Sequence, residues 1–204
     1  MKLQVMSLLH RYFIINKPYN MVSQFISSHQ VGLLGDLDFD FPVNTHAIGR
    51  LDNHSEGLLL LTTNKKVTRL LFLGDEPHKR VYLVQVNNIL STENLEKLRT
   101  GVSIRIKGGE NYITPPCEAE IVEEPEKLYR TAFTKDEHGN HTWLLITLTE
   151  GKFRQVRKMM AAVRHRCKRL IRISIEELVL GDLAPGQVKE INEKEFFDRL
   201  KIKY

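Results

Sequence analysis

Residues 142–163 read TWLLITLTEGKFRQVRKMMAAV, and the hydrophobic pattern of this stretch changes half-way along it. Residues 142–149 are mostly apolar, aromatic or β-branched, which favours a central strand. Glu150-Gly151 predicts a turn, and apolar residues then recur at helical spacing over 153–163. These residues share one face of the expected helix: Phe153, Val156, Met160 and Val163. The stretch therefore predicts a buried strand, a tight turn and an amphipathic helix packed against the core.

Shorter hydrophobic runs on both sides predict further strands and helices. The expected strands span residues 12–15, 58–61, 79–86, 102–106, 119–122 and 168–175. Helices are expected at 65–73, at 92–98 with an end at Gly101, and after the capping pair Asn192 and Glu195. Residues 29–49 and 123–141 are expected to be long loops. Because strands and helices alternate irregularly, the predicted class is α+β, with a central mixed, largely antiparallel sheet and flanking helices.

The composition is that of a globular protein, with 42% hydrophobic and 27% charged residues among 204. This length predicts one large domain or two small lobes that share a core. No run approaches the roughly 18 apolar residues of a membrane span. His10, Arg11 and Lys17 interrupt the region where a secretory signal needs an apolar core. Cys117 and Cys167 form no CxxC pair, which is typical of a reduced protein. We therefore expect a cytoplasmic protein with no membrane partner.

Positive charge is concentrated in one window of the chain. The protein carries 30 basic and 25 acidic residues, a net charge of +5. Residues 152–172 hold nine Lys or Arg and no acidic residue, so the rest of the chain nets −4. Such a basic surface favours a polyphosphate ligand. The alternative is a solvated basic face. A membrane-surface helix fits less well, because the window has no Trp and its apolar residues are needed for the core.

A second pattern, GRLDNHSEGLLLLTTN at residues 49–64, places an acid just before a buried strand. Arg50 is near enough to Asp52 to favour the carboxylate against the effect of burial. An ionised Asp52 can act as a nucleophile or a base. Two structural alternatives stay open, in which Asp52 only caps the turn or only pairs with Arg50. A two-carboxylate glycosidase site would need Glu56 as the second acid. Nothing else indicates sugar binding, and the only tryptophan, Trp143, falls in the central strand.

The acidic loop and the basic window hold two further groups of reactive side chains. Asp136, His138 and His141 lie close together in the sequence, and such side chains can hold a metal ion. A solvated loop is the simpler interpretation, so we expect no metal. Cys167 lies among basic residues, where a thiol can become reactive, but a half-buried strand cysteine is the default.

Four sequence blocks occur in an order and spacing typical of one enzyme family. They are NKP at 16–18, GRLD at 49–52 with SEGLLLLT at 55–62, KRVYLVQV at 79–86 and EGKFRQVRKM at 150–159, followed by RLIR at 169–172 and LGDLAPG at 180–186. Over residues 12–190 the chain resembles the pseudouridine synthases of the RsuA-like branch. NKPY with QF at 24–25, and TWLLITL before the EGK block, are most similar to members that act on the RNA of the large ribosomal subunit.

The resemblance implies a pseudouridine synthase fold, in which a central mixed sheet carries an active-site cleft between two subdomains. It implies isomerisation of uridine to pseudouridine in ribosomal RNA, with 23S rRNA favoured, and neither a cofactor nor a metal. Residues 1–204 would form a single catalytic domain, because Asp52 lies too near residue 1 for the separate N-terminal RNA-binding domain of many members. We expect a monomer that binds free rRNA or an assembling particle. The alternatives are the same chemistry on small-subunit rRNA or tRNA, and a catalytically silent rRNA-binding assembly factor.

The resemblance also implies roles for individual residues. Asp52 matches the catalytic aspartate, which acts as the nucleophile, and Arg50 matches the basic residue two positions before it. Tyr82 matches the aromatic residue that packs against the target base, and Arg157 matches the basic residue that pairs with the aspartate. Lys17 belongs to the first block, and we expect it to contact RNA. The remaining RNA contacts are expected from the basic window: Lys152, Arg154, Lys158, Arg164, Arg166 and Lys168.

Overall fold

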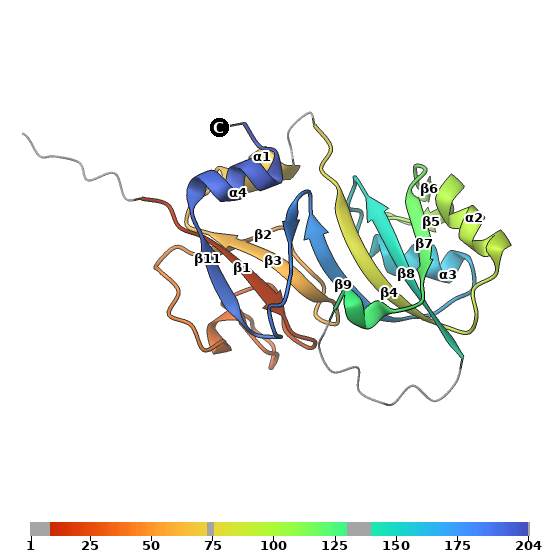
Figure 1. Ribbon diagram of the computed structural model, residues 1–204, viewed down its shortest axis with the longest axis horizontal. Helices are drawn as coiled ribbons and strands as arrows, with labels where there is room; N and C mark the ends of the chain where they lie inside the picture. The colour runs from red at the N-terminus through yellow and green to blue at the C-terminus, as the bar shows by residue number, and fades with distance from the viewer. Residues whose placement is uncertain (1–8, 73–75, 130–139, 204) are drawn as a thin grey trace, which may run out of the picture.

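The computed structural model describes residues 9–72, 76–129 and 140–203, and Figure 1 shows their arrangement. The strands are β1 (Tyr12–Lys17), β2 (His46–Ile48), β3 (Glu56–Thr62), β4 (Arg80–Asn87), β5 (Ser103–Arg105), β6 (Asn111–Ile113), β7 (Glu118–Val122), β8 (His141–Leu148), β9 (Cys167–Ile175), β10 (Leu178–Val179) and β11 (Val188–Ile191). The α-helices are α1 (Val67–Phe72), α2 (Thr92–Thr100), α3 (Gln155–Ala162) and α4 (Glu193–Leu200), with short 3-10 turns η1 (Leu34–Asp36) and η2 (Pro125–Lys127). None of these helices is long and apolar enough to cross a membrane.

One sheet runs through the described part of the chain. Its strands follow the order β11-β1-β3-β9-β4-β8-β7, with β2 paired to β3 and β10 paired to β9. β5 and β6 form a separate two-stranded ribbon. β3 and β9 run parallel, whereas the other pairs among the described strands are antiparallel. The sheet is therefore mixed and largely antiparallel, which confirms the predicted class.

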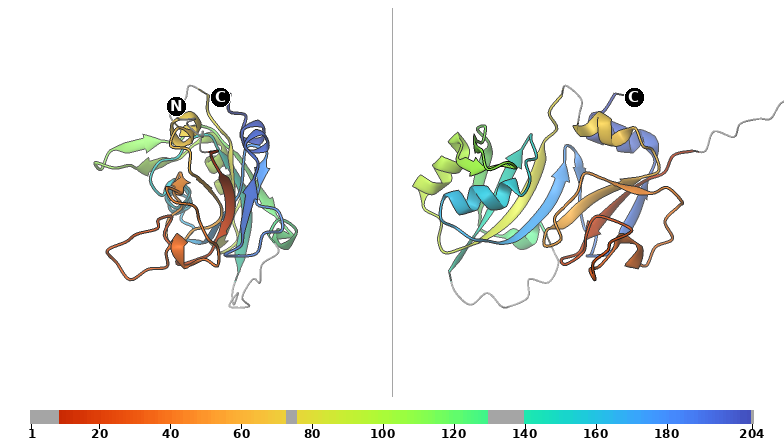
Figure 2. Two further views of the ribbon diagram at one scale, coloured as in Figure 1. Left: turned by 90° about the vertical axis from the view of Figure 1, so that its left-hand side faces the viewer. Right: turned by 180° about the vertical axis from the view of Figure 1, so that it is seen from behind.

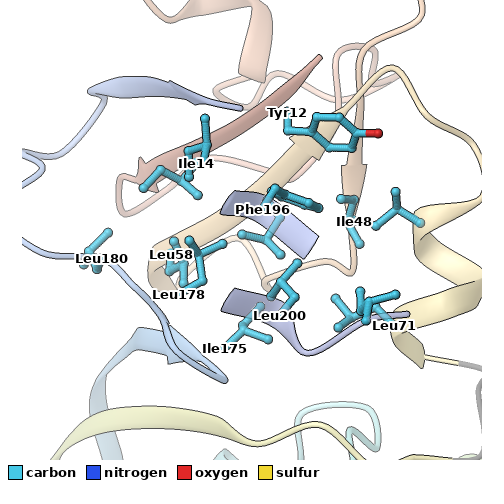
Figure 3. Close-up of a cluster of buried hydrophobic side chains, with 14 of the residues drawn as sticks. Tyr12, Ile14, Ile48, Leu58, Leu71, Ile175, Leu178, Leu180, Phe196 and Leu200 are labelled. Atoms are coloured by element: carbon cyan, nitrogen blue, oxygen red, sulfur yellow. The ribbon is translucent and has the colours of Figure 1, made fainter. Parts of the chain in front are cut away.

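Two halves of the molecule meet at the β3–β9 pair, and different helices cover them (Figures 1 and 2). Figure 3 shows the core under α1 and α4, where Phe196 and Leu200 pack with Tyr12 and Leu71. A further cluster lies on the opposite face of β1 and β3, so both strands are buried along their whole length. In the other half, Met160 and its neighbours on α3 pack against β4, β8 and β9. The helices thus leave the junction between the halves accessible to a ligand.

Local capping signals correctly predict both limits of α2 and the start of α4. Ser91 Oγ accepts a hydrogen bond from the Asn94 N–H at 3.2 Å, and α2 ends at Gly101, whose φ is +115°. Asn192 Oδ1 accepts a hydrogen bond from the Glu195 N–H at 2.8 Å at the start of α4. The apolar residues of α4 are all buried: Phe196, Phe197 and Leu200. Capping depends on residues three apart, which is why the sequence alone reveals it.

Other sequence-based expectations are wrong. The loop predicted at 29–49 contains η1 and β2, and β2 pairs with the distant strand β3. Such short strands have no local signal of their own, because the partner strand creates them. Patterns in the sequence do not predict β6, β10 and β11 either. Phe153 precedes α3 and is 68% exposed instead of buried, because the chain turns at Arg154 with φ +54° before the helix begins at Gln155.

Gly57 allows β3 and β9 to approach closely. Its φ is +95°, and a Cβ there would lie 2.3 Å from the carbonyl oxygen of Arg172. Gly57→Ala should therefore lower the free energy of unfolding strongly, because backbone and not a mobile side chain must move. Gly108→Ala is the matched control, since Gly108 has φ +94° and no atom within 4 Å of its Cβ position.

Urea denaturation measures the two variants against the wild type. The free energy of unfolding of Gly108→Ala should be lower than that of the wild type by roughly 1–2 kcal/mol, from backbone strain alone. Gly57→Ala should lose at least about 2 kcal/mol more, because overpacking adds to the strain. Equal losses in the two variants would contradict the close approach at Gly57.

Candidate active site

A cavity of about 690 Å³ opens where the two halves meet. Its walls come from the loop before β3, the segment between α1 and β4, the turn between β8 and α3, and strand β9. Of the predicted site residues, Arg50, Asp52, Tyr82, Lys152 and Arg154 line it. The volume lies in the usual range for a small-molecule site, and residues from distant parts of the sequence converge there.

Asp52 lies on a turn whose backbone is held from several sides. The Ser55 N–H donates to the Asp52 carbonyl at 3.0 Å. Just before the turn, Ser23 Oγ donates to the Leu51 carbonyl and accepts from the Leu51 N–H, both at 3.0 Å. The Asp52 side chain is 29% exposed. The turn therefore presents a partly shielded carboxylate to the cavity on a fixed backbone.

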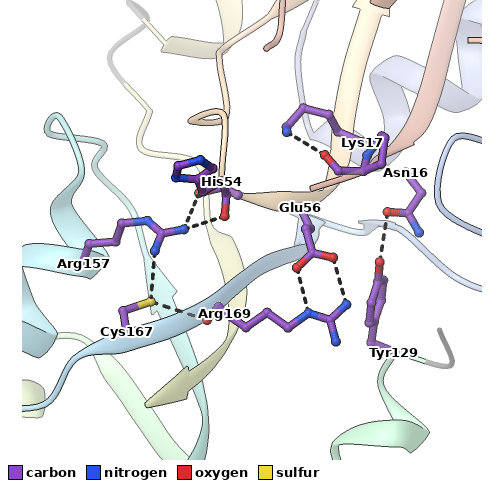
Figure 4. Close-up of polar contacts among 10 residues, drawn as sticks. Asn16, Lys17, His54, Glu56, Tyr129, Arg157, Cys167 and Arg169 are labelled. Atoms are coloured by element: carbon purple, nitrogen blue, oxygen red, sulfur yellow. Dashed lines mark hydrogen bonds and ion pairs between the residues drawn. The ribbon is translucent and has the colours of Figure 1, made fainter. Parts of the chain in front are cut away.

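Arg157 extends from α3 to the turn that carries Asp52, and Figure 4 shows its contacts with His54 and Cys167. Its Nε lies 3.9 Å from Asp52 Oδ2. Its Nη2 donates to the His54 carbonyl at 2.7 Å and to Ser55 Oγ at 3.2 Å, and its Nη1 lies 3.7 Å from Cys167 Sγ. Nε is buried and has no hydrogen-bond partner within the described structure. The arrangement places a positive charge beside the carboxylate without a short hydrogen bond between the two groups.

Arg80 and Arg172 also line the cavity, and the sequence analysis missed both of them. Tyr82 on β4 is opposite Arg172 on β9. Burial lowers the pKa of Arg172, while the Tyr82 hydroxyl acts in the opposite direction. Burial likewise lowers the pKa of Arg80. Arg80 Nη1 and Arg172 Nη2 are buried without a hydrogen-bond partner in the described structure, so both can donate to a bound substrate. Their only sequence signal was their place inside the KRVYLVQV and RLIR blocks.

The predicted RNA-binding residues fall into two groups. Lys152 and Arg154 line the cavity, and Arg154 is exposed with a left-handed backbone that is uncommon outside glycine. Arg50 lines this cavity and a neighbouring one of about 470 Å³. The other basic residues lie outside the cavity: Lys158 is half-buried beside the Phe153 ring, and Arg164, Arg166 and Lys168 are exposed. The basic window therefore extends from the cavity rim onto the surface at the end of α3 and the start of β9.

The position of Lys17 does not fit the predicted RNA contact. Lys17 is fully buried, and its Nζ donates to the carbonyls of Met21 at 2.6 Å, Pro18 at 2.9 Å and Asn53 at 3.3 Å. Burial lowers its pKa to about 8, although nearby carboxylates act in the opposite direction. Lys17 therefore ties the end of β1 to the turn that carries Asp52, and we assign it a supporting role instead.

Glu56 is engaged in an ion pair outside the cavity. Arg169 Nε and Nη2 donate to its two carboxylate oxygens at 2.7 and 2.8 Å, and the same guanidinium lies 5.4 Å from the centre of the Tyr129 ring. Glu56 does not line the cavity with Asp52. This geometry leaves no support for a two-carboxylate glycosidase site.

The other reactive groups considered from the sequence are Cys167 and the Asp136, His138 and His141 group. Burial raises the pKa of Cys167 to about 11, which fits a structural strand cysteine. Across residues 9–72, 76–129 and 140–203, no three His, Cys, Asp or Glu residues come together as metal ligands. Asp136 and His138 lie outside the described residues, and His141 begins β8.

Comparison with known proteins identifies the family. The sequence model of the RNA pseudouridylate synthases matches residues 11–162. The chain belongs to this family. The synthase is 37% identical over 183 residues to the ribosomal large subunit pseudouridine synthase E of Vibrio parahaemolyticus, covering 89% of this chain and 74% of that protein. It is 35% identical over 180 residues to the Xanthomonas axonopodis protein of the same name, covering 84% and 89% of the two chains.

More distant relatives agree with this assignment. The synthase is 28% identical over 186 residues to the ribosomal small subunit pseudouridine synthase A of Yersinia pestis, covering 91% of this chain and 71% of that protein. A crystal structure of a pseudouridylate synthase matches it with a TM-score of 0.75 at 25% identity, over 94% of this chain and 74% of the other. The predicted resemblance, the pseudouridine synthase fold and the isomerase class are therefore confirmed.

The buried ammonium of Lys17 gives a pH-dependent contribution to stability. Its pKa is about 8 in the folded protein against 10.5 for an unperturbed lysine. Between these values the unfolded chain holds a proton that the folded protein has released, so stability rises with pH. Across this pH range the free energy of unfolding of the wild type should rise, relative to that of Lys17→Met, by up to about 3 kcal/mol. The expected slope is about 1.4 kcal/mol per pH unit.

Chemical denaturation at pH 7.5, 9 and 10.5 measures this difference. Lys65→Met is the matched control, because Lys65 is exposed in the folded protein. The difference in the free energy of unfolding between the wild type and Lys65→Met should not change over the same pH range. If the difference in the free energy of unfolding between the wild type and Lys17→Met also did not change with pH, this would contradict a buried ammonium at Lys17.

Proposed function

We propose that this synthase converts uridine to pseudouridine in the RNA of the large ribosomal subunit, 23S rRNA, with Asp52 as the nucleophile. The observation that carries the proposal is that Asp52 lies beside Arg157 and shares one cavity with Tyr82. Relatives named as large-subunit enzymes are 35% and 37% identical to this chain, against 28% for the small-subunit relative. That difference supports the choice of subunit.

The reaction exchanges one bond of the target nucleoside for another. The bond from the ribose C1′ to N1 of uracil breaks, and a bond from C1′ to C5 forms. The hydrogen on C5 leaves as a proton and N1 gains one, so the product is an isomer and no oxidant or reductant is required. A carboxylate fixed at the cavity wall, such as Asp52, can attack the nucleoside while the free base turns within the cavity.

Access to the cavity requires that the uridine leaves its stack in the RNA. Flipping a base out costs a few kcal/mol. The Tyr82 ring in the cavity wall offers a stacking surface, and base–aromatic stacking contributes roughly 1–3 kcal/mol. Arg80 and Arg172 present buried N–H groups that can donate to uracil carbonyls or ribose oxygens. Stacking and hydrogen bonding in the cavity would therefore replace the interactions that the base loses when it flips out of the RNA.

The RNA backbone would follow the basic window. Lys152, Arg154 and Arg50 line the cavity, and the exposed cations at the end of α3 continue the path. Contacts of this kind position RNA without reading its sequence. We place the reaction in the cytoplasm, with a monomer acting as a single catalytic unit. Small-subunit rRNA, tRNA and a silent assembly factor are the competing proposals that experiment must separate.

Tritium release from RNA labelled at C5 of uridine tests the proposed chemistry. The wild type should release tritium from large-subunit rRNA and not from small-subunit rRNA. Asp52→Asn should lose at least about a thousandfold in rate, as expected when a nucleophile is removed. Its affinity for RNA in a filter-binding assay should be retained.

Asp198→Asn is the matched control, because Asp198 is an exposed acid on α4 that pairs with Lys194. This variant should be as active as the wild type. Release from small-subunit rRNA alone would overturn the subunit, and undiminished release by Asp52→Asn would overturn the nucleophile.

The salt dependence of RNA binding tests the path along the basic window. Replacing Arg164, Arg166 and Lys168 with Ala should reduce the slope of log K against log salt by about 2–3, if each cation neutralises one phosphate. The control removes three exposed charges from the far helix and its following residues: Lys194, Lys201 and Lys203. The control slope should equal that of the wild type, and equal slopes in all three proteins would place the RNA path elsewhere.

A further inference from the structure

Two exposed aromatic rings stack on each other next to the Asp52 turn. The rings of Tyr19 and His54 lie 5.1 Å apart, centre to centre, at an interplanar angle of 15°. Tyr19 is 55% exposed and His54 is also exposed. Neither ring belongs to the hydrophobic core clusters that hold the ring pairs of Tyr12 or Phe13. The pair therefore does not contribute to the core, and its position needs another explanation.

The backbone on both sides of the ring pair is held in place. Lys17 Nζ donates to the carbonyl of Pro18, which precedes Tyr19, and to the carbonyl of Asn53, which precedes His54. A single buried ammonium thus links the two segments that carry the rings. The side-chain amide of Asn53 also donates to Asn20 Oδ1 at 3.1 Å. The rings consequently stand on segments that are already joined before any ligand arrives.

Arg157 connects the ring pair to the reaction site. Its Nη2 donates to the His54 carbonyl at 2.7 Å (Figure 4). Its Nε lies 3.9 Å from Asp52 Oδ2. His54 and Asp52 belong to the same turn, which the Ser55 N–H closes onto the Asp52 carbonyl. The turn that carries the His54 ring is therefore the turn that carries Asp52. Little conformational entropy would be lost on binding, because the backbone under the rings is already ordered.

We propose that Tyr19 and His54 form a second base-binding site, on which a nucleobase adjacent to the target uridine stacks while the target occupies the cavity. The proposal rests on the proposed function, since it requires RNA in the Asp52 cavity. When the target flips out, its neighbour loses a stacking partner in the RNA. The exposed face of the ring pair replaces that partner, and because every base has a flat face the site is tolerant of sequence. The ligand class is an unpaired purine or pyrimidine base of an RNA strand.

Kinetics of tritium release separate base binding from a purely structural role. Tyr19→Leu and His54→Leu should each raise KM roughly 5- to 150-fold, the effect of losing one base–aromatic stack, with little change in kcat. Tyr19→Phe keeps the ring and should retain most of the affinity. Ile121→Ala removes an exposed apolar side chain from the edge strand β7 and serves as the control with wild-type KM. A fall in kcat at unchanged KM would mean that the rings only stiffen the Asp52 turn, which would overturn the proposal.

Binding measurements distinguish failure of this proposal from failure of the proposed function. Asp52→Asn provides a background in which RNA affinity is measured without chemistry. If the wild type releases no tritium but Tyr19→Leu still weakens binding of large-subunit rRNA by the same factor, the proposed function is wrong, although the rings bind an RNA base. If the wild type is active and the Leu variants bind and react as the wild type does, the base site is wrong and the function stands.

A double-mutant cycle identifies the base. Once the isomerised uridine has been mapped, RNAs with an abasic residue at either neighbour are assembled by splinted ligation. The penalty of Tyr19→Leu should disappear with one of these RNAs, because the stack is already absent. If the effects of Tyr19→Leu and of the missing base on RNA affinity are fully additive with both abasic RNAs, the assignment of the site to an adjacent base is overturned.

Discussion

The close approach of β3 and β9 is the constraint from which the active site follows. Gly57 lacks a Cβ at the point where the Arg172 carbonyl passes, and Arg172 Nε donates to the Leu58 carbonyl at 2.8 Å. The ion pair between buried Glu56 on β3 and half-buried Arg169 on β9 also holds this junction. Because β3 starts there, the turn before it must face the strands of the second half. Asp52 and Tyr82 therefore meet in one cavity although they come from different halves of the protein.

Buried cations organise the loops around this cavity. Lys17 is surrounded by three carbonyls, and Arg157 bonds to the backbone of the Asp52 turn while its remaining nitrogen faces the carboxylate. A buried charge is tolerated only where hydrogen bonds satisfy it, so each cation selects one conformation of the loop that supplies the acceptors. The same bonds that stabilise these cations position the Asp52 turn and the exposed rings of Tyr19 and His54. Stability and geometry of the site are thus produced by one set of contacts.

Local patterns predict much of the fold because their physical cause is local. The capping residues of α2 and α4, the apolar run of β3 and the alternating strand β4 are all recognisable within a few neighbours. The short strands β2 and β11 were missed because their hydrogen-bond partners lie far away in the sequence. Phe153 was misplaced because a left-handed residue, Arg154, shifts the start of α3 away from the apolar repeat.

The order of the four blocks is sufficient to indicate the family. Matching these blocks also predicts Asp52, Tyr82 and Arg157 as site residues from the sequence alone. The proposed chemistry depends on the residue types at those positions, which can be read directly from the sequence. Which cations are exposed and which are buried is decided only when distant strands pair. Lys17 resembles a surface lysine in the sequence, yet the folded chain surrounds it with carbonyls. Arg80, Arg172 and the Tyr19–His54 stack likewise emerge only in three dimensions, because burial and ring contact depend on segments that the linear sequence keeps apart.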